Sequence, residues 1–161
     1  MIVLGVDPGT ATTGFGLVDF SNRKPVAITH GVIRTKPDLD MASRLMVIAS
    51  DLKELVEQYR PDAVAVEELF FANNAKTAIA VGQARGVILL TLAQANYQVY
   101  EYTPLQIKLA IAGYGRASKR QIQEMVKRLL CLVDLPKPDD AADGLAIALT
   151  HYNFAKRLDR V

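Results

Sequence analysis

The most constraining feature of this sequence is an uninterrupted apolar run at residues 2–6, Ile-Val-Leu-Gly-Val, which ends in Asp7. Such a run suits a β-strand that is buried on both faces, because a half-exposed strand alternates apolar and polar residues. Pro8-Gly9-Thr10 then breaks the strand. A strand of this kind requires other elements to cover both faces of its sheet.

The rest of the chain predicts more strands first and then helices that alternate with strands. Short links join strands at residues 2–6, 14–20 and 26–34, which indicates an antiparallel meander. Further strands are predicted at 62–67 and 97–102, and helices at 40–59, 74–94, 105–112, 118–130 and 138–154. We therefore expect an α/β fold with a mixed five-stranded sheet, an antiparallel meander plus parallel strands, flanked by helices.

Length and composition fit a single domain over residues 1–161, since domains cluster near ~100–150 residues. The one cysteine, Cys131, excludes an internal disulfide framework and a zinc site of several cysteines, and it fits a reducing cytoplasm. No apolar run approaches the ~18–20 residues of a membrane span, and the N-terminus does not resemble a signal peptide. We therefore expect a cytoplasmic protein with no membrane partner.

The distribution of charge is more informative than the net charge of +2. Residues 103–130 contain six basic residues and one acid, whereas residues 34–68 contain five basic residues and eight acids. The first segment is a candidate anion-binding surface. Its composition is equally consistent with a solvated helical face.

Acidic residues occur where three predicted elements begin or end. Asp7 ends the first strand, the pair at 67–68 ends the fourth, and Asp139, Asp140 and Asp143 begin the last helix. Strand ends at one edge of such a sheet form a crevice where ligands bind. Asp140 shares a helix face with Asp143, but so does Asp139, and periodicity cannot choose between these pairs.

Converging carboxylates need cations, and sites with oxygen ligands alone suit Mg²⁺ or Mn²⁺. Two such ions ~3.5–4 Å apart can clamp the attacking and leaving oxygens of a phosphodiester displacement. Each acid also has an ordinary explanation. Asp7 can cap a turn, and acids at a helix start are favoured electrostatically.

Several motifs resemble the RuvC family of Holliday-junction resolvases. They are Leu4-Gly5-Val6-Asp7-Pro8-Gly9-Thr10 with Thr13-Gly14-Phe15-Gly16, then Val66-Glu67-Glu68-Leu69-Phe70, Val81-Gly82-Gln83-Ala84-Arg85-Gly86, and the segment from Asp140-Ala141-Ala142-Asp143 to His151. The resemblance runs nearly end to end, in the same order and at the same total length.

This resemblance implies an RNase H-like fold, a homodimer, and Mg²⁺-dependent endonuclease action in recombination and repair, with Mn²⁺ as a substitute. The substrate implied is four-way junction DNA, cut by paired symmetric nicks, and the implied partners are the branch-migration proteins RuvA and RuvB. The family's four metal-binding catalytic carboxylates correspond to Asp7, Glu67, Asp140 and Asp143. The roles of Glu68 and Asp139 stay open.

The resemblance also identifies residues near DNA. Lys108 and Lys119 match positions beside the DNA backbone, and Arg116 and Arg120 flank them. Phe70 matches a position that meets unstacked bases, whereas we expect Phe71 in the core. Asn73 and Asn74 suit a helix cap or a base contact equally. The helix at 74–94 corresponds to the dimer element.

The two histidines and the one cysteine are expected to have structural roles rather than catalytic ones. His151 lies too far along its helix from Asp143 to join a first shell of ligands, His30 has no acidic motif beside it, and Cys131 resembles a buried small hydrophobe.

Three other functions each account for part of the sequence. An ATP-binding domain of the actin and sugar-kinase type shares Asp7-x-Gly9-Thr10, but it needs a second lobe that 161 residues cannot supply. An RNA-cutting relative explains the basic helices less well. A non-catalytic junction binder predicts a missing carboxylate, and none is missing.

Overall fold

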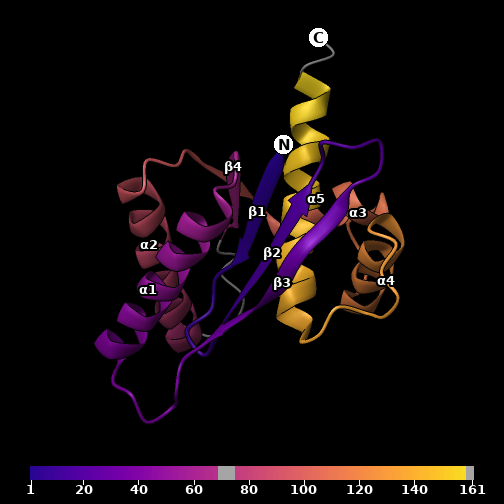
Figure 1. The fold of residues 1–161 in the computed structure, drawn as a ribbon. Coiled ribbons are helices and arrows are strands. Elements are labelled where there is room, and N and C mark those ends of the chain that lie inside the picture. Colours follow the sequence, from indigo (N-terminus) through magenta and orange to yellow (C-terminus); the bar gives the residue numbers. More distant parts are fainter. Residues whose placement is uncertain (69–74, 159–161) are drawn as a thin grey trace.

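A computed structural model describes residues 1–68 and 75–158 of the chain. Its centre is a mixed five-stranded sheet, as the sequence predicts (Figure 1). The strands lie in the order β3-β2-β1-β4-β5. The strands are β1 (Ile2–Asp7), β2 (Thr12–Asp19), β3 (Val26–Arg34), β4 (Ala63–Glu67) and β5 (Val99–Tyr102). The helices are α1 (Met41–Tyr59), α2 (Ala75–Gln94), α3 (Pro104–Ala112), α4 (Lys119–Leu129) and α5 (Asp139–Leu158).

The pairing of the strands decides which ends meet. β1 pairs antiparallel with β2, and β2 pairs antiparallel with β3, which completes the predicted meander. β1 pairs parallel with β4, and β4 pairs parallel with β5. Because β1 and β4 run in the same direction side by side, their carboxyl ends lie at one edge of the sheet.

Helices cover both faces of this sheet. α1 and α2 lie together on one side, and α3, α4 and α5 lie on the other (Figure 1). α5 begins at the edge where β1 ends and runs back along the sheet toward the N-terminus. This arrangement explains the continuous apolar run of β1, since Val3, Leu4 and Val6 are all fully buried.

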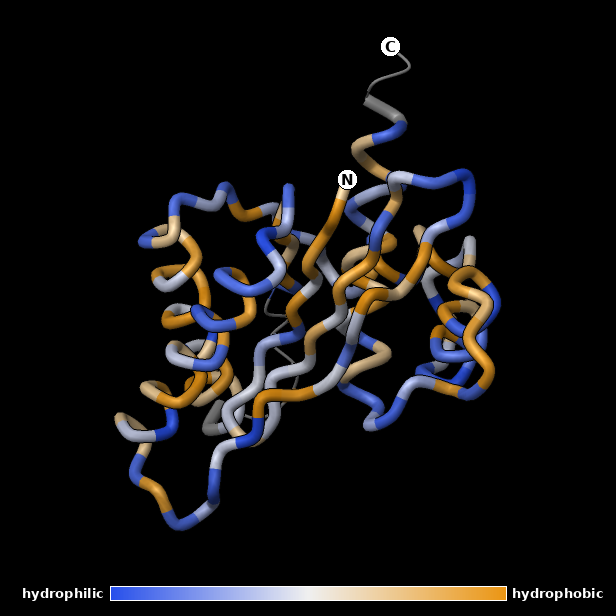
Figure 2. Tube along the Cα trace, viewed as in Figure 1, coloured by the Kyte–Doolittle hydropathy of each residue, from blue (hydrophilic) through white to orange (hydrophobic). Residues whose placement is uncertain are grey.

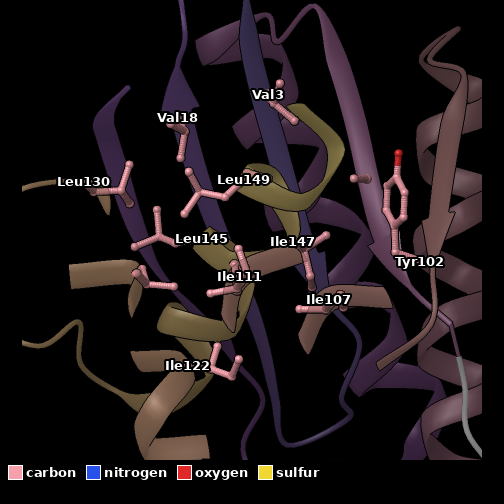
Figure 3. Packing of buried hydrophobic residues seen from close by; sticks show 14 of the residues in the cluster. Val3, Val18, Tyr102, Ile107, Ile111, Ile122, Leu130, Leu145, Ile147 and Leu149 are labelled. Atoms are coloured by element: carbon pink, nitrogen blue, oxygen red, sulfur yellow. The ribbon is translucent and has the colours of Figure 1, made fainter. Parts of the chain in front are cut away.

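Two hydrophobic cores correspond to the two layers. The core beneath α1 and α2 includes Leu4, Leu17 and Ile48. The core beneath α3, α4 and α5 is drawn in Figure 3, where Val3 and Val18 of the sheet face Leu145 and Ile147 of α5. Hydrophobic residues recur along the central strands and along the helices that cover them (Figure 2).

Local signals fix where the helices begin. The Asp40 side chain accepts from the Ser43 backbone N–H at 2.8 Å and caps α1. Capping boxes start α3 at Thr103 and α4 at Ser118. The α4 cap makes Lys119 the first residue of its helix. α3 ends at Gly113, whose positive φ of 83° favours glycine.

Glycines bring α5 unusually close to the sheet. Gly5 and Gly16 are directly paired across β1 and β2. A Cβ atom on Gly16 would lie 2.5 Å from the Leu145 backbone nitrogen, and one on Gly5 would lie 2.5 Å from that of Ala148. On the helix side, a Cβ on Gly144 would lie 2.6 Å from the Gly16 nitrogen. The helix backbone therefore rests directly on the backbone of two strands.

The structure corrects one residue and several boundaries. The sequence predicts that Cys131 is buried among apolar residues. In the structure Cys131 is exposed, and it adopts a φ of 52° just after α4. The turn that ends α4 carries it to the surface, since the Cys131 and Leu132 backbone N–H groups bond back to Arg128 and Lys127. β5 begins at Val99 rather than at residue 97, and α5 extends to Leu158 rather than to residue 154.

One stretch of the described residues, Thr77–Gln94 in α2, is long and apolar enough to cross a membrane by length and composition alone. Its mean hydropathy is 1.2, and 22% of it is buried within the chain. Ala84, Ile88 and Leu92 belong to the core beneath α1 and α2, so one face of this helix packs against the fold. The opposite face is largely open.

The glycine contacts predict that Gly16→Ala destabilises the protein. The new methyl group would collide with the backbone of α5, which cannot move as a side-chain tip can, and overpacking of this kind costs roughly 1–3 kcal/mol or more. Gly31→Ala is the matched control on β3, because its methyl would meet only the end of the Phe15 ring at 3.1 Å. Urea unfolding should show the larger loss for Gly16→Ala, and equal losses would contradict the account.

Candidate active site

Three carboxylates from distant parts of the chain meet at one edge of the sheet. Asp7 is the last residue of β1, and Asp140 and Asp143 lie in the first turns of α5. Each offers an oxygen, and these oxygens all lie within 4.8 Å of one another. The sequence predicts that these acids converge. The convergence requires that β1 and β4 end at the same edge of the sheet and that α5 begins there.

Glu67 joins the group from the neighbouring strand. It ends β4, which lies beside β1, and its negative charge is one of the causes that raise the pKa of Asp7. Asp7, Glu67, Asp140 and Asp143 are called the acidic cluster below. Glu68 and Asp139 are exposed, and the group of converging oxygens does not include them.

The geometry of α5 decides which acids face the site. Ala141 and Ala142 are fully buried, so the two residues between the acids point into the core. Asp140 and Asp143 are three residues apart and share the face directed at β1. The structure thus selects the Asp140–Asp143 pair, which the periodicity of the sequence left open against Asp139 and Asp143.

Asp140 is held in place from β2. The Thr12 hydroxyl donates to its Oδ2 at 2.8 Å. A Cβ on Gly14 would lie 2.6 Å from the Asp140 carbonyl carbon and 3.1 Å from its Cβ. Only glycine at position 14 therefore allows Asp140 to approach the sheet this closely. Gly14 belongs to a motif that the sequence shows, but nothing in that motif reveals this contact or the hydrogen bond from Thr12.

Burial and mutual repulsion perturb the acidic cluster. Burial, followed by the charges of Glu67 and Asp143, raises the pKa of Asp7 well above its usual value. Burial is also the largest cause that raises the pKa of Glu67 and of Asp143. These carboxyl groups therefore hold their protons to a higher pH than isolated carboxyl groups do, and a positive charge placed among them would favour their ionised forms.

One basic side chain reaches into the cluster. The Lys119 Nζ lies 2.9 Å from Asp143 Oδ2 and 3.8 Å from Asp140 Oδ1. In residues 1–68 and 75–158, no other basic side chain forms an ion pair with an acid of the cluster. The sequence predicted Lys119 beside DNA but not in contact with these acids. The capping box at Ser118 is the signal that fixes its place at the start of α4.

A cavity of about 200 Å³ adjoins the cluster. Glu67, Asp143, Lys108 and Lys119 supply its polar lining. Ile107, Ile122 and Ile147, labelled in Figure 3, supply much of its apolar wall. The cavity therefore places two ammonium groups and two carboxylates around one space, an arrangement suited to a phosphate held beside carboxylate oxygens that could hold a metal ion.

Two other predicted DNA contacts, Arg116 and Arg120, are not among the residues that line this cavity. Arg116 and Arg120 are exposed, and Arg120 forms an ion pair with Glu124 on the same helix at 3.0 Å. Phe70 and its neighbours Phe71, Asn73 and Asn74 lie outside the described residues. The structure thus brings Lys108 and Lys119 to the site and leaves the two arginines on the surrounding surface.

His151 has the structural place that the sequence analysis gave it. It is buried, its Nδ1 lies 2.9 Å from the Tyr102 hydroxyl, and burial lowers its pKa. His30 is half-buried on β3. A contact that the sequence did not reveal is the ion pair between Arg85 of α2 and Glu101 of β5.

Comparisons with known proteins agree with this geometry. The family model for crossover junction endodeoxyribonuclease RuvC matches residues 3–151. The RuvC protein of Desulforamulus reducens is 53% identical over 155 residues, covering 96% of this chain and 95% of that protein. The RuvC protein of Halothermothrix orenii is 53% identical over 160 residues, covering 99% and 96%.

A solved structure supports the same assignment. The Thermus thermophilus RuvC in complex with a Holliday junction substrate superposes with a TM-score of 0.92 at 39% identity, covering 98% of this chain and 96% of that one. The architecture described above is thus the RNase H-like fold of these proteins. From the matching sequence model, the relatives and the shared fold, we conclude that this chain belongs to the RuvC family of crossover junction endodeoxyribonucleases.

Proposed function

We propose that this protein resolves four-way DNA junctions by paired symmetric nicks, as a Mg²⁺-dependent endodeoxyribonuclease of recombination and repair. The observation that carries the proposal is the acidic cluster, with three carboxylates whose oxygens lie within 4.8 Å of one another and a fourth, Glu67, at the end of the strand beside β1. Membership of the RuvC family and likeness to a junction-bound relative support the substrate.

The donor set fits hard divalent ions. Asp7, Glu67, Asp140 and Asp143 offer only carboxylate oxygens, which are the ligands that Mg²⁺ and Mn²⁺ prefer. Four carboxylates carry about enough negative charge for two such ions. When bound, two ions would activate water and stabilise the departing 3′ oxygen.

The chain's own residues have distinct tasks in this proposal. The Thr12 hydroxyl orients Asp140 by its 2.8 Å hydrogen bond. Lys108 and Lys119 line the cavity beside the cluster and hold the scissile phosphate there. The apolar wall of the cavity strengthens these electrostatic contacts by keeping water away.

The surrounding basic surface binds the arms of the junction. Arg116 and Arg120 are exposed near the start of α4 and extend the positive charge of Lys108 and Lys119. As backbone contacts they position DNA without reading its sequence. We assign Phe70 to unstacked bases near the centre of the junction, because stacking on an aromatic side chain tolerates any base.

The open face of α2 supports a homodimer. Ile79, Gln83, Gly86 and Leu90 are all exposed and recur at three- and four-residue steps, so they form one stripe. Ile79 is 64% and Leu90 is 58% exposed, and Gly86 leaves room for a second backbone. Pairing through this stripe would present two acidic clusters to a two-fold substrate.

RuvA and RuvB are the proposed partners at the junction, and the bacterial cytoplasm is the proposed compartment. Both assignments rest on the family and on its bacterial members.

Cleavage of a synthetic four-way junction beside a linear duplex in Mg²⁺ tests the proposed function. We expect paired nicks in the junction alone. Asp7→Asn should lower the cleavage rate by more than about 100-fold while sparing junction binding, because electrostatic stabilisation is usually the largest catalytic contribution.

Asp139→Asn is the matched control, since Asp139 carries the same charge at the start of α5 but is exposed beside the cluster. It should retain cleavage. Equal cutting of the duplex, or full activity of Asp7→Asn, would contradict the proposal.

The dimer is tested by Leu90→Asp, which places a charge in the exposed stripe of α2. Sedimentation should show the wild-type protein at twice the 17.6 kDa chain mass and the variant at the chain mass. Met46→Asp is the control, because Met46 of α1 is 72% exposed on another helix. An unchanged dimer in Leu90→Asp would exclude this interface.

A further inference from the structure

Lys119 occupies oxygens that a metal ion would need. Its ammonium group lies 2.9 Å from Asp143 Oδ2 and 3.8 Å from Asp140 Oδ1. The other oxygen of Asp140 accepts the Thr12 hydroxyl at 2.8 Å. In this arrangement both oxygens of Asp140 and one oxygen of Asp143 already face a partner.

The same lysine also borders open space beside the cluster. It is the first residue of α4, its side chain is 51% exposed, and it lines the cavity that it shares with Lys108. A lysine has a flexible stem and a compact charge that needs no fixed geometry, so its ammonium can pass from a carboxylate to a nearby phosphate.

We propose that Lys119 is an exchangeable cation, which occupies Asp143 and Asp140 in the free protein and moves to a DNA phosphate when substrate binds. Its departure frees the carboxylate oxygens for divalent ions. This inference rests on the proposed function and adds a thermodynamic coupling between the binding of divalent ions and the binding of DNA. A lysine that competes with metal but attracts DNA makes each ligand favour the other, and such coupling is reciprocal.

The first test measures Mn²⁺ affinity in the free protein, for example by the electron paramagnetic resonance signal of unbound Mn²⁺. Lys119→Met removes the competing cation and should tighten Mn²⁺ binding by roughly 5- to 150-fold, the usual range of such couplings. Lys127→Met is the matched control, because it makes the same substitution eight residues along α4, about 12 Å away. It should change the affinity little.

Two failures of this test are distinguishable. If Asp7→Asn abolishes Mn²⁺ binding but Lys119→Met binds no tighter than Lys127→Met, the competition is overturned and the proposed function stands. If Asp7→Asn leaves Mn²⁺ binding unchanged, the proposed metal site fails, and this inference fails with it. Circular dichroism checks the fold, and Lys119→Gln repeats the test with a polar side chain.

The second test measures the exchange itself. Junction affinity is determined with and without Ca²⁺, whose longer and looser coordination should support junction binding without efficient cutting. Ca²⁺ should tighten junction binding by roughly fivefold or more in the wild-type protein, and by a smaller factor in Lys119→Met. An equal factor in both proteins would overturn the exchange.

Discussion

The close contact between α5 and the glycines of β1 and β2 is the constraint on which the rest of the structure depends. Gly16 lets the helix backbone rest on the strands, and Gly14 lets Asp140 descend beside the end of β1. With side chains at these positions, the helix would stand farther from the sheet, and its two acids would no longer meet Asp7. The close packing of α5 on the sheet therefore also brings the carboxylates of the acidic cluster together.

This packing has an electrostatic consequence. Burial and neighbouring negative charges raise the pKa values of Asp7, Glu67 and Asp143 together, so the metal-free cluster is a region of unfavourable charge. Lys119 relieves part of it through its contact with Asp143. Under the proposed function, divalent ions would relieve more of this repulsion, and the unfavourable charge of the folded cluster would favour their binding. Stability and the proposed function are then opposed at this edge of the sheet.

Much of the fold could be predicted from the sequence, because apolar periodicity and turn residues mark the elements, and strands that end in acids mark one edge of the sheet. Periodicity could not choose Asp140 over Asp139. The family resemblance identifies Asp140 instead of Asp139, and the burial of Ala141 and Ala142 explains why Asp140 and Asp143 share the face toward β1. The contact of Lys119 with the cluster depends on how α4 packs beside α5, which no local pattern encodes. The prediction for Cys131 is wrong for a different reason: its neighbours in the sequence are apolar, but the turn after α4 places it at the surface.

The most direct measurement is the stability of the wild-type protein and Asp7→Asn between about pH 4 and 8, without metal and with Mn²⁺. A raised pKa means that the stabilising contribution of the Asp7 carboxyl is complete below its unfolded value of 3.8 and is lost as pH rises through the folded value. We therefore expect metal-free Asp7→Asn to become progressively more stable than the wild-type protein as pH rises, and Mn²⁺ to stabilise the wild-type protein selectively. If the stabilities of the two proteins change in parallel with pH, and Mn²⁺ stabilises both equally, repulsion within the acidic cluster does not destabilise the metal-free fold and the account is contradicted.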